Sequence, residues 1–204
     1  MENEGNIYDI VRSGIMNNYN IVVADSSETS RKKVCGLLAK KGYRTYQATD
    51  GAGALRIARS IFPDLVIMDI NLWGINAFEV ASIIEEDKLS TVVFITGSPN
   101  SDFYEKLRTM NIFAYINRPI NPDQLYQIVE FSIINSNKIS LLEEKVEKLE
   151  STLEARKKID RAKGILIEKL KITENEAYKL LRKKSMDSCV SMEKIAEEII
   201  KKYL

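Results

Sequence analysis

The chain has 204 residues, of which 45% are hydrophobic, and a formal net charge of +1, so it has room for one large domain or two small ones. It contains no histidine, which excludes imidazole general bases, Ser-His triads and His-ligated metals. The charge is uneven, because residues 1–136 carry 13 basic and 16 acidic side chains whereas residues 155–204 carry 14 and 8. A basic excess at one end is typical of a segment that binds phosphates, but also of solvated lysine-rich helical bundles.

Neither export nor membrane insertion is indicated by the sequence. Cys35 and Cys189 are isolated and far apart, as expected in a reducing cytosol rather than in a disulfide-bonded scaffold. No apolar run approaches the length of a membrane span, and residues 1–20 do not read as a signal peptide. We therefore expect a cytoplasmic protein with no membrane partner, in which residues 1–18 form an N-terminal extension, either a frayed tail or a short docked helix.

Between residues 19 and 136, short apolar segments alternate with segments of helical length. The apolar segments are 21–24, 44–48, 65–68, 92–95 and 114–116, and the helical ones are 30–40, 52–61, 77–86, 102–110 and 122–135. Residues 65–68 are apolar on consecutive positions, as in a strand covered on both faces. The pattern predicts a doubly wound α/β domain with a five-stranded parallel sheet and a functional site at the carboxyl ends of the strands.

A connector is predicted at residues 137–158. Its apolar residues follow a 3-4-3-4 spacing: Ile139, Leu142, Val146, Leu149 and Leu153. Such a stripe, flanked by charged residues, is typical of a coiled coil, although it spans only two heptads. The interpretation that we favour is a parallel homodimer contact; the alternative is an amphipathic helix that packs within one chain. No Gly or Pro separates Pro122 from Gly164, so one helix is free to run through the connector.

An all-α domain of three helices is predicted at residues 150–204. The first helix continues from the connector to Leu170, the second spans about 174–186, and the third spans 192–203. Thr173 and Glu176 form a predicted capping box, and Ser191 is a predicted N-cap. The predicted core residues have helical spacing: Ala162, Ile165, Leu166, Ala177, Leu180, Leu181, Ile195, Ala196, Ile199 and Ile200.

The polar residues at the strand ends of the first domain form a recognisable set. Asp25 ends the first predicted strand, Asp69 ends the third, Thr96 ends the fourth before Gly97, and the fifth leads to Arg118-Pro119. Over about residues 20–135 this arrangement resembles the receiver domain of two-component response regulators, with its flavodoxin-like, CheY-like fold.

The resemblance implies a role for each of these residues. Asp69 would accept a phosphoryl group from the phosphohistidine of a sensor histidine kinase. Mg²⁺ would be bound by Asp25, Asp69 and the backbone carbonyl of Asn71. Thr96 and Arg118 would contact the phosphoryl oxygens, and the aromatic ring of Tyr115 would turn inward when Thr96 moves.

Several positions depart from the receiver pattern. Ser26 stands where a second adjacent carboxylate is usual, which should weaken Mg²⁺ binding. Arg118 stands where lysine is usual, and the two are not interchangeable. Trp73 replaces a usual proline, and Asn76-Ala77 replaces a usual turn with glycine. Two alternatives therefore stay open: a switch driven by phosphorylation of Asp69, or a degenerate receiver controlled by another regulatory protein.

The C-terminal segment contains several motifs in order. They are residues 161–166 (RAKGIL), 176–178 (EAY), 180–182 (LLR) and 185–188 (SMDS). From about residue 149 to residue 203 this series resembles the ANTAR domain, a three-helix RNA-binding module of bacterial antitermination regulators. The resemblance implies binding of RNA stem-loops in a nascent transcript, so that an antiterminator forms at the expense of a terminator.

Candidate RNA contacts follow from this resemblance. Basic side chains grip the nucleic-acid backbone, and aromatic rings stack on unpaired bases. The candidates are Arg161, Lys163, Arg182 and Lys183 for phosphates or bases, Tyr178 for stacking, and the hydroxyls of Ser185 and Ser188. A buried packing role for Tyr178 is equally consistent with the sequence.

The leading hypothesis is an RNA-binding antitermination regulator whose receiver controls it. A DNA-binding response regulator is the first alternative, but residues 192–203 form a short helix with three glutamates, which suits a major groove poorly. A phosphate-independent protein-interaction module is the second alternative. We expect no catalytic residues beyond the Asp69 site and no small-molecule substrate.

Overall fold

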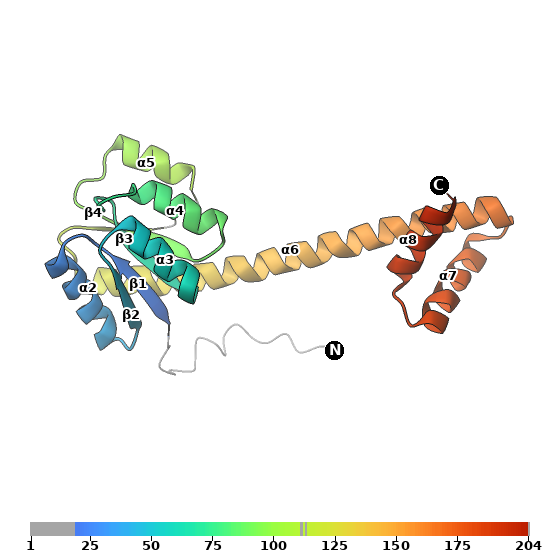
Figure 1. The fold of residues 1–204 in the computed structure, drawn as a ribbon, viewed down its shortest axis with the longest axis horizontal. Coiled ribbons are helices and arrows are strands. Elements are labelled where there is room, and N and C mark those ends of the chain that lie inside the picture. Colours follow the sequence, from blue (N-terminus) through green and yellow to red (C-terminus); the bar gives the residue numbers. More distant parts are fainter. Residues whose placement is uncertain (1–18, 111, 113, 204) are drawn as a thin grey trace. The chain divides into compact units, whose positions relative to one another are not determined.

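The computed structural model describes residues 19–110, 112 and 114–203, so the predicted N-terminal extension, residues 1–18, lies outside the described residues. The chain forms two compact units, which divide between Lys138 and Ile139. The 49-residue helix α6 (Pro122–Leu170) contributes residues to both units (Figure 1). None of the helices in the described part of the chain is long and apolar enough to cross a membrane.

The first unit is built on a five-stranded parallel sheet, which confirms the predicted fold. The strands are β1 (Asn20–Ala24), β2 (Arg44–Ala48), β3 (Leu65–Asp69), β4 (Thr91–Thr96) and β5 (Tyr115–Asn117). Their order in the sheet is β2-β1-β3-β4-β5, so the winding reverses between β1 and β3. Doubly wound sheets place their binding sites at such a reversal, at the carboxyl ends of the strands.

Four helices and the start of α6 connect the strands. They are α2 (Glu28–Lys40), α3 (Gly51–Ile61), α4 (Ala77–Glu86) and α5 (Ser101–Arg108). Each of the four begins after a polar residue whose side chain accepts a backbone N–H: Ser27, Asp50, Asn76 and Asn100. These caps satisfy N–H groups that have no partner within the helix. The sequence therefore fixes where each helix starts relative to the strand before it.

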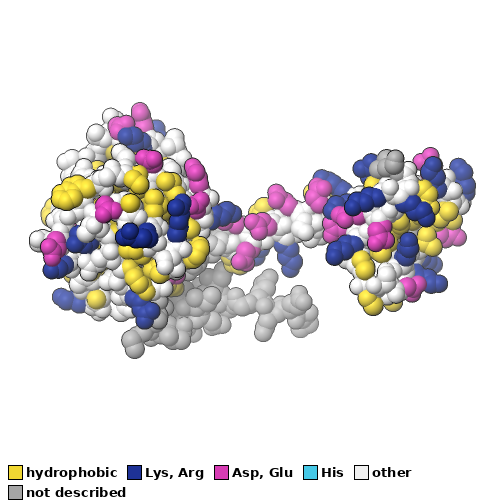
Figure 2. All heavy atoms as spheres, viewed as in Figure 1, with side chains coloured by type: hydrophobic (Ala, Val, Ile, Leu, Met, Phe, Trp, Pro, Cys, Tyr) yellow, Lys and Arg dark blue, Asp and Glu magenta, His cyan; other side chains and the backbone are white. Residues whose placement is uncertain are grey.

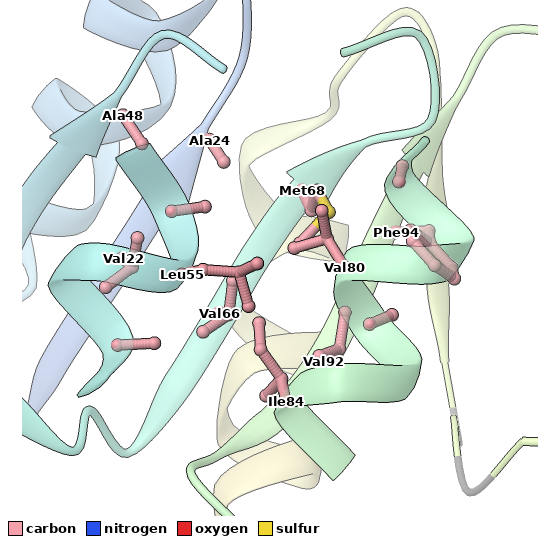
Figure 3. Close-up of a cluster of buried hydrophobic side chains, with 14 of the residues drawn as sticks. Val22, Ala24, Ala48, Leu55, Val66, Met68, Val80, Ile84, Val92 and Phe94 are labelled. Carbon is pink, nitrogen blue, oxygen red and sulfur yellow. The ribbon is translucent and has the colours of Figure 1, made fainter. Parts of the chain in front are cut away.

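Alternate residues of the central strands enter two separate cores, one on each face of the sheet. Val22, Ala24, Val66 and Met68 pack with residues of α3 and α4 (Figure 3), whereas Ile21, Val23, Leu65 and Ile67 pack with residues of α2 and α6. Burial on both faces explains why these strands are apolar at consecutive positions. Each fully buried aliphatic side chain contributes roughly 1.5–3 kcal/mol. The two cores thereby hold the strand ends, and the polar residues on them, in register.

The second unit packs α7 (Glu174–Ser188) and α8 (Met192–Tyr203) with the last part of α6. Its buried core consists of Ala162, Leu166, Ala177, Leu181, Ile195, Ala196 and Ile199. The capping box of Thr173 and Glu176 is present as predicted, and α7 runs two residues past its predicted end at Met186. The prediction that Leu180 is a core residue was wrong, because its side chain is 43% exposed. Adjacent helical residues point about 100° apart, and Leu181 takes the core position.

Candidate functional site

The polar residues predicted from the strand ends come together at one edge of the sheet. Asp25 follows β1, Asp69 is the last residue of β3, and Thr96 is the last residue of β4. Arg118 follows β5, and its backbone N–H donates to the carbonyl of Thr96 at 2.8 Å. The peptide bond between Arg118 and Pro119 is cis. The parallel sheet therefore assembles four of the predicted receiver residues into a single pocket, which we call the strand-end pocket.

The guanidinium of Arg118 lies between the two carboxylates of the strand-end pocket. Its Nη2 donates to Asp25 Oδ2 at 2.8 Å and also contacts Asp69 Oδ2. Its Nε donates to the same oxygen of Asp69 at 3.2 Å, and its Nη1 donates to Ser30 Oγ at 2.9 Å. One cationic side chain thus bridges the ends of β1 and β3, where the receiver pattern had predicted a contact to a phosphoryl group.

The remaining carboxylate oxygens are engaged by backbone N–H groups. Asp25 Oδ1 accepts from the N–H of Ser27 at 2.8 Å, and Asp69 Oδ1 accepts from the N–H of Asn71 at 2.7 Å. Asn71, whose carbonyl was predicted to bind a metal, contacts Asp69 through its backbone N–H. Asp25 and Asp69 are only 2% and 5% exposed, so all four of their oxygens have protein partners in a largely buried setting.

A second arginine, which the sequence did not single out, supports the pocket. Arg31 of α2 is buried and donates from Nη1 to the backbone carbonyl of Asp25 at 2.6 Å. Its Nε donates to Gln47 Oε1 at 3.2 Å. Nothing in the sequence distinguishes Arg31 from a surface arginine of an amphipathic helix. The positive charges of Arg31 and Arg118 thus equal in number the negative charges of Asp25 and Asp69.

The protonation of Arg118 is reinforced by its partners. Burial alone would lower the pKa of Arg118, but its hydrogen bonds to Asp69 and Asp25 outweigh this effect and raise that pKa. An arginine side chain is in any case always charged in proteins. The positive charge in the strand-end pocket is therefore permanent over the physiological pH range.

The residues present do not fit the Mg²⁺ site that receiver domains generally have in their acidic pocket. Ser26 occupies the position of a second carboxylate, and its hydroxyl accepts the N–H of Trp73 at 2.9 Å and donates to the carbonyl of Thr49 at 3.1 Å. Within the described residues, no group of three or more carboxylate or thiol side chains is placed to hold a metal ion. A magnesium ion needs free oxygen ligands in near-octahedral geometry, and here the carboxylates face a guanidinium.

Thr96 and Tyr115, the two predicted switch residues, lie on the paired strands β4 and β5. Thr96 is fully buried, and its hydroxyl has no hydrogen-bond partner among the described residues. The ring of Tyr115 packs edge-on against Phe103 at 5.3 Å between centroids, and its hydroxyl lies 3.0 Å from that of Tyr104. The hydrogen bond with Tyr104 is the main cause of the raised pKa of Tyr115. An unpartnered hydroxyl at the end of β4, the strand that pairs with β3, is what the family's phosphoryl-binding threonine would present.

Three of the predicted RNA contacts share one side of α7, on which Tyr178 and Arg182 are exposed and Ser185 is half-buried. Tyr178, Arg182 and Ser185 are spaced four and three residues apart, which places them on the same helical face. Tyr178 is 43% exposed, so it is not the buried packing residue that the sequence also allowed. The hydroxyls of Ser185 and Ser188 donate to the carbonyls of Val190 and Lys184 at the end of this helix. Their oxygens keep the capacity to accept a hydrogen bond.

Arg161 and Lys163 do not share a face of α6. Residues two apart on a helix point in different directions, and the side chain of Lys163 is only 15% exposed. Its ammonium pairs with Asp160 at 2.6 Å and with Glu174 of α7 at 2.9 Å, and these hydrogen bonds raise the pKa of Lys163. Arg161 is exposed. The structure thus gives Lys163 a role in joining α6 to α7.

A comparable ion pair, missed by the sequence reasoning, joins α6 to α8. Lys158 pairs with Glu193 at 2.7 Å and with Glu197 at 2.6 Å, and hydrogen bonds to both carboxylates raise the pKa of Lys158. Two of the three glutamates on α8 are thereby engaged within the second unit. Arg182 and Lys183 stay exposed on α7. Figure 2 shows many basic side chains over the C-terminal helices, interspersed with acidic and apolar ones.

The apolar stripe of the predicted connector is uncovered in the single chain. Leu142, Val146, Leu149 and Leu153 are each more than half exposed, and Ile139 is half-buried. All five lie on α6, which is unbroken over this region. Within the described residues these four side chains are therefore free to contact a partner.

The sheet, with its two aspartates, threonine and arginine at one edge, defines a receiver domain. Residues 21–130 match the response regulator receiver domain model, and residues 147–200 match the ANTAR domain model. The chain is 30% identical over 181 residues to the transcriptional regulatory protein PdtaR of Mycobacterium tuberculosis, and the match covers 88% of each chain. The chain therefore belongs to the response regulators that join an N-terminal receiver domain to a C-terminal ANTAR domain, a generally non-enzymatic family.

Solved structures agree with the fold of the first unit. The N-terminal domain of a response regulator/sensory box/GGDEF protein from Carboxydothermus hydrogenoformans is 26% identical, with a TM-score of 0.55, over 59% of this chain and 98% of that chain. The chemotaxis protein CheY4 of Vibrio cholerae is 20% identical, with a TM-score of 0.54, over 56% of this chain and 98% of that chain. Both likenesses concern the receiver part of the chain.

Proposed function

We propose that this response regulator binds stem-loops in nascent RNA and promotes transcription antitermination in the cytoplasm. The observation that carries the proposal is the ANTAR match over residues 147–200 together with the exposed Tyr178 and Arg182, one turn apart on α7. An aromatic ring beside a guanidinium suits an unpaired base next to a phosphate. No small-molecule substrate is part of this proposal.

Among the candidate contacts, the structure supports some more than others. Arg182, Lys183 and Arg161 are exposed and so are available to a phosphate. Lys163 forms ion pairs with Asp160 and Glu174, so we propose that it stabilises the RNA-binding unit and does not contact the RNA directly. Ser185 and Ser188 remain as acceptors at the C-terminal end of α7.

The proposal includes a homodimer formed through α6. Its support is the uncovered stripe of Leu142, Val146, Leu149 and Leu153, which follows coiled-coil spacing. A parallel pair of α6 helices would bury this stripe and bring two RNA-binding units into one molecule. Two hairpins in one transcript would then be bound with higher avidity than one.

The test is direct binding to a fluorescein-labelled RNA with two short hairpins, followed by anisotropy. We expect Arg182→Ala and Tyr178→Ala each to weaken binding by at least about fivefold, because a stacked base or a phosphate contact contributes on the order of 1–3 kcal/mol. Lys33→Ala, an exposed lysine of the receiver, is the matched control and should bind as the wild type does. Equal affinity of all four proteins would refute the proposed RNA face.

The same assay separates the proposal from the DNA-binding alternative. A duplex DNA of equal length and charge competes for the electrostatic part of binding but offers no unpaired bases. We expect the hairpin RNA to bind at least about tenfold more tightly than the duplex. Tighter binding of the duplex would favour a DNA-binding regulator instead. A transcription reaction with a terminator downstream of the hairpins then tests antitermination itself.

A further inference from the structure

We propose that Arg118 is the resident cation of the strand-end pocket and takes the place of Mg²⁺ there. The pocket is then neutralised by the protein itself, and the resting state of the receiver does not depend on a divalent metal. This inference concerns the control of the receiver and stands independently of RNA binding.

Every carboxylate oxygen of Asp25 and Asp69 already has a hydrogen-bond donor. Both Oδ2 atoms of Asp25 and Asp69 accept from Arg118, and both Oδ1 atoms accept from backbone N–H groups. A metal that bound these carboxylates would have to displace at least the guanidinium. Displacement would also break the bond from Arg118 to Ser30 at 2.9 Å, so a metal competes with a whole set of charge-assisted hydrogen bonds.

The charges of the strand-end pocket cancel without a metal ion. Asp25 and Asp69 bring two negative charges, and Arg118 and Arg31 bring two positive charges. Hard cations gain affinity from the number of carboxylates that they meet. A divalent ion entering this pocket would meet a neutral cluster and a guanidinium that cannot lose its proton. Repulsion between cations at a partly buried site is several-fold larger than in bulk water.

Ser26, which stands where a second carboxylate would be needed, has a structural role instead. The hydroxyl of Ser26 joins the segment after β1 to the loop after β3, because it accepts from the N–H of Trp73 and donates to the carbonyl of Thr49. Where a metal site would need a second carboxylate, the chain thus has a neutral hydroxyl that links two loops by hydrogen bonds. The hydrogen bond to Ser26 also fixes the backbone of Trp73, the single tryptophan of the chain, close to the pocket.

The contact with Arg118 also affects the reactivity of Asp69. The oxygen that would attack a phosphorus atom, Oδ2, accepts two hydrogen bonds from Arg118. A carboxylate oxygen that is held in this way is a weaker nucleophile than a free one, because its lone pairs are stabilised. Control of the receiver by another protein is therefore favoured over metal-assisted phosphorylation.

The experiment measures binding of Mn²⁺ and Mg²⁺ to the full chain. Free Mn²⁺ is followed by electron paramagnetic resonance. Binding of Mg²⁺ is followed by its ability to displace Mn²⁺ and by the fluorescence of Trp73. Metal is added to about ten times the ~1 mM dissociation constant of weak carboxylate sites. Four proteins are compared: the wild type, Ser26→Asp, Ser26→Asp with Arg118→Ala, and Arg59→Lys. Arg59 pairs with Asp87 on an exposed surface and is the matched control.

We expect no saturable site in the wild type or in Arg59→Lys. The double variant should bind one ion, and on the order of tenfold or more tightly than Ser26→Asp alone, because removal of Arg118 relieves cation–cation repulsion. Circular dichroism checks that each variant folds, and Arg118→Gln with Ser26→Asp, which also removes the positive charge, replaces the double variant if alanine unfolds the unit. A saturable Mg²⁺ site in the wild type would overturn the proposal. Equal binding by Ser26→Asp with and without Arg118 would also overturn it.

Discussion

At the scale of single residues, two threonines of β4 differ in how their hydroxyls are satisfied. Thr96 is fully buried with an unpartnered hydroxyl, whereas Thr91 donates to Ser136 Oγ at 2.8 Å. A buried polar group without a partner costs roughly 1–3 kcal/mol, while a formed hydrogen bond contributes about 1 kcal/mol. We therefore expect Thr96→Val to raise the free energy of unfolding by about 1 kcal/mol and Thr91→Val to lower it by about the same amount.

Urea denaturation followed by the fluorescence of Trp73 measures both changes, because this tryptophan lies in the first unit. Both variants replace a threonine hydroxyl with a methyl group on the same strand, so each serves as the control of the other. Destabilisation by both variants to the same extent would mean that the hydroxyl of Thr96 has a partner in solution. An ordered water molecule would be the simplest such partner.

The sequence was sufficient to place Asp25, Asp69, Thr96 and Arg118 in one pocket. Its strand pattern implies a parallel sheet, and the carboxyl ends of neighbouring parallel strands meet at one edge. It was not sufficient to predict the buried Arg31 or the bridge from Arg118 to both aspartates. Those contacts depend on side-chain directions and on the distance between α2 and β1, which no local pattern encodes.

At the scale of elements, the capping box of α7 makes the stability of this helix depend on pH. The Glu176 carboxylate accepts hydrogen bonds from the backbone N–H and from the hydroxyl of Thr173. These bonds, the backbone one most of all, lower the pKa of Glu176 below its ordinary value of 4.5. A carboxyl group whose pKa is lower in the folded state stabilises the fold above the unfolded pKa. That contribution is lost as the pH falls through the folded pKa.

We therefore expect Glu176→Gln to increase hydrogen exchange of the first-turn amides of α7 at pH 7. The difference from the wild type should shrink as the pH falls below 4.5, where the wild-type carboxyl group becomes protonated. Glu198→Gln, on the exposed side of α8, is the control and should leave these amides unchanged. A difference that stayed constant down to pH 3 would contradict the assigned role of the carboxylate.

The helices were predicted more reliably than the faces that they present. Caps and apolar spacing were enough to locate α7 and α8, because helix ends leave backbone groups that only certain side chains satisfy. Adjacent residues such as Leu180 and Leu181 were harder to assign, since a helix of this length has room for only one narrow buried stripe. The separation of Arg161 from Lys163 has the same geometric cause.

At the scale of the whole molecule, the stripe on α6 predicts self-association. A leucine that becomes buried contributes roughly 1.5–3 kcal/mol to the free energy of association. In a symmetric dimer each leucine of the stripe is buried in both subunits. Leu149→Glu should therefore weaken the dimer by at least about thirtyfold, which corresponds to about 2 kcal/mol. Size-exclusion chromatography with light scattering measures the mass at several concentrations. Ser151→Glu, two positions along the same helix and off the stripe, is the control, and a monomeric wild type at high concentration would exclude the dimer.

The dependence of RNA binding on salt separates the two kinds of contact proposed for α7. Each phosphate contact contributes about 0.7–0.9 to the slope of log K against log salt, because it releases condensed counterions. Arg182→Ala should therefore make the slope shallower by about this amount. Tyr178→Ala should lower the affinity at every salt concentration and leave the slope unchanged, because stacking releases no ions. Anisotropy titrations over a series of salt concentrations measure both, with Lys33→Ala as the control. If the slope changed for Tyr178→Ala and not for Arg182→Ala, the proposed division between stacking and phosphate contact would be wrong.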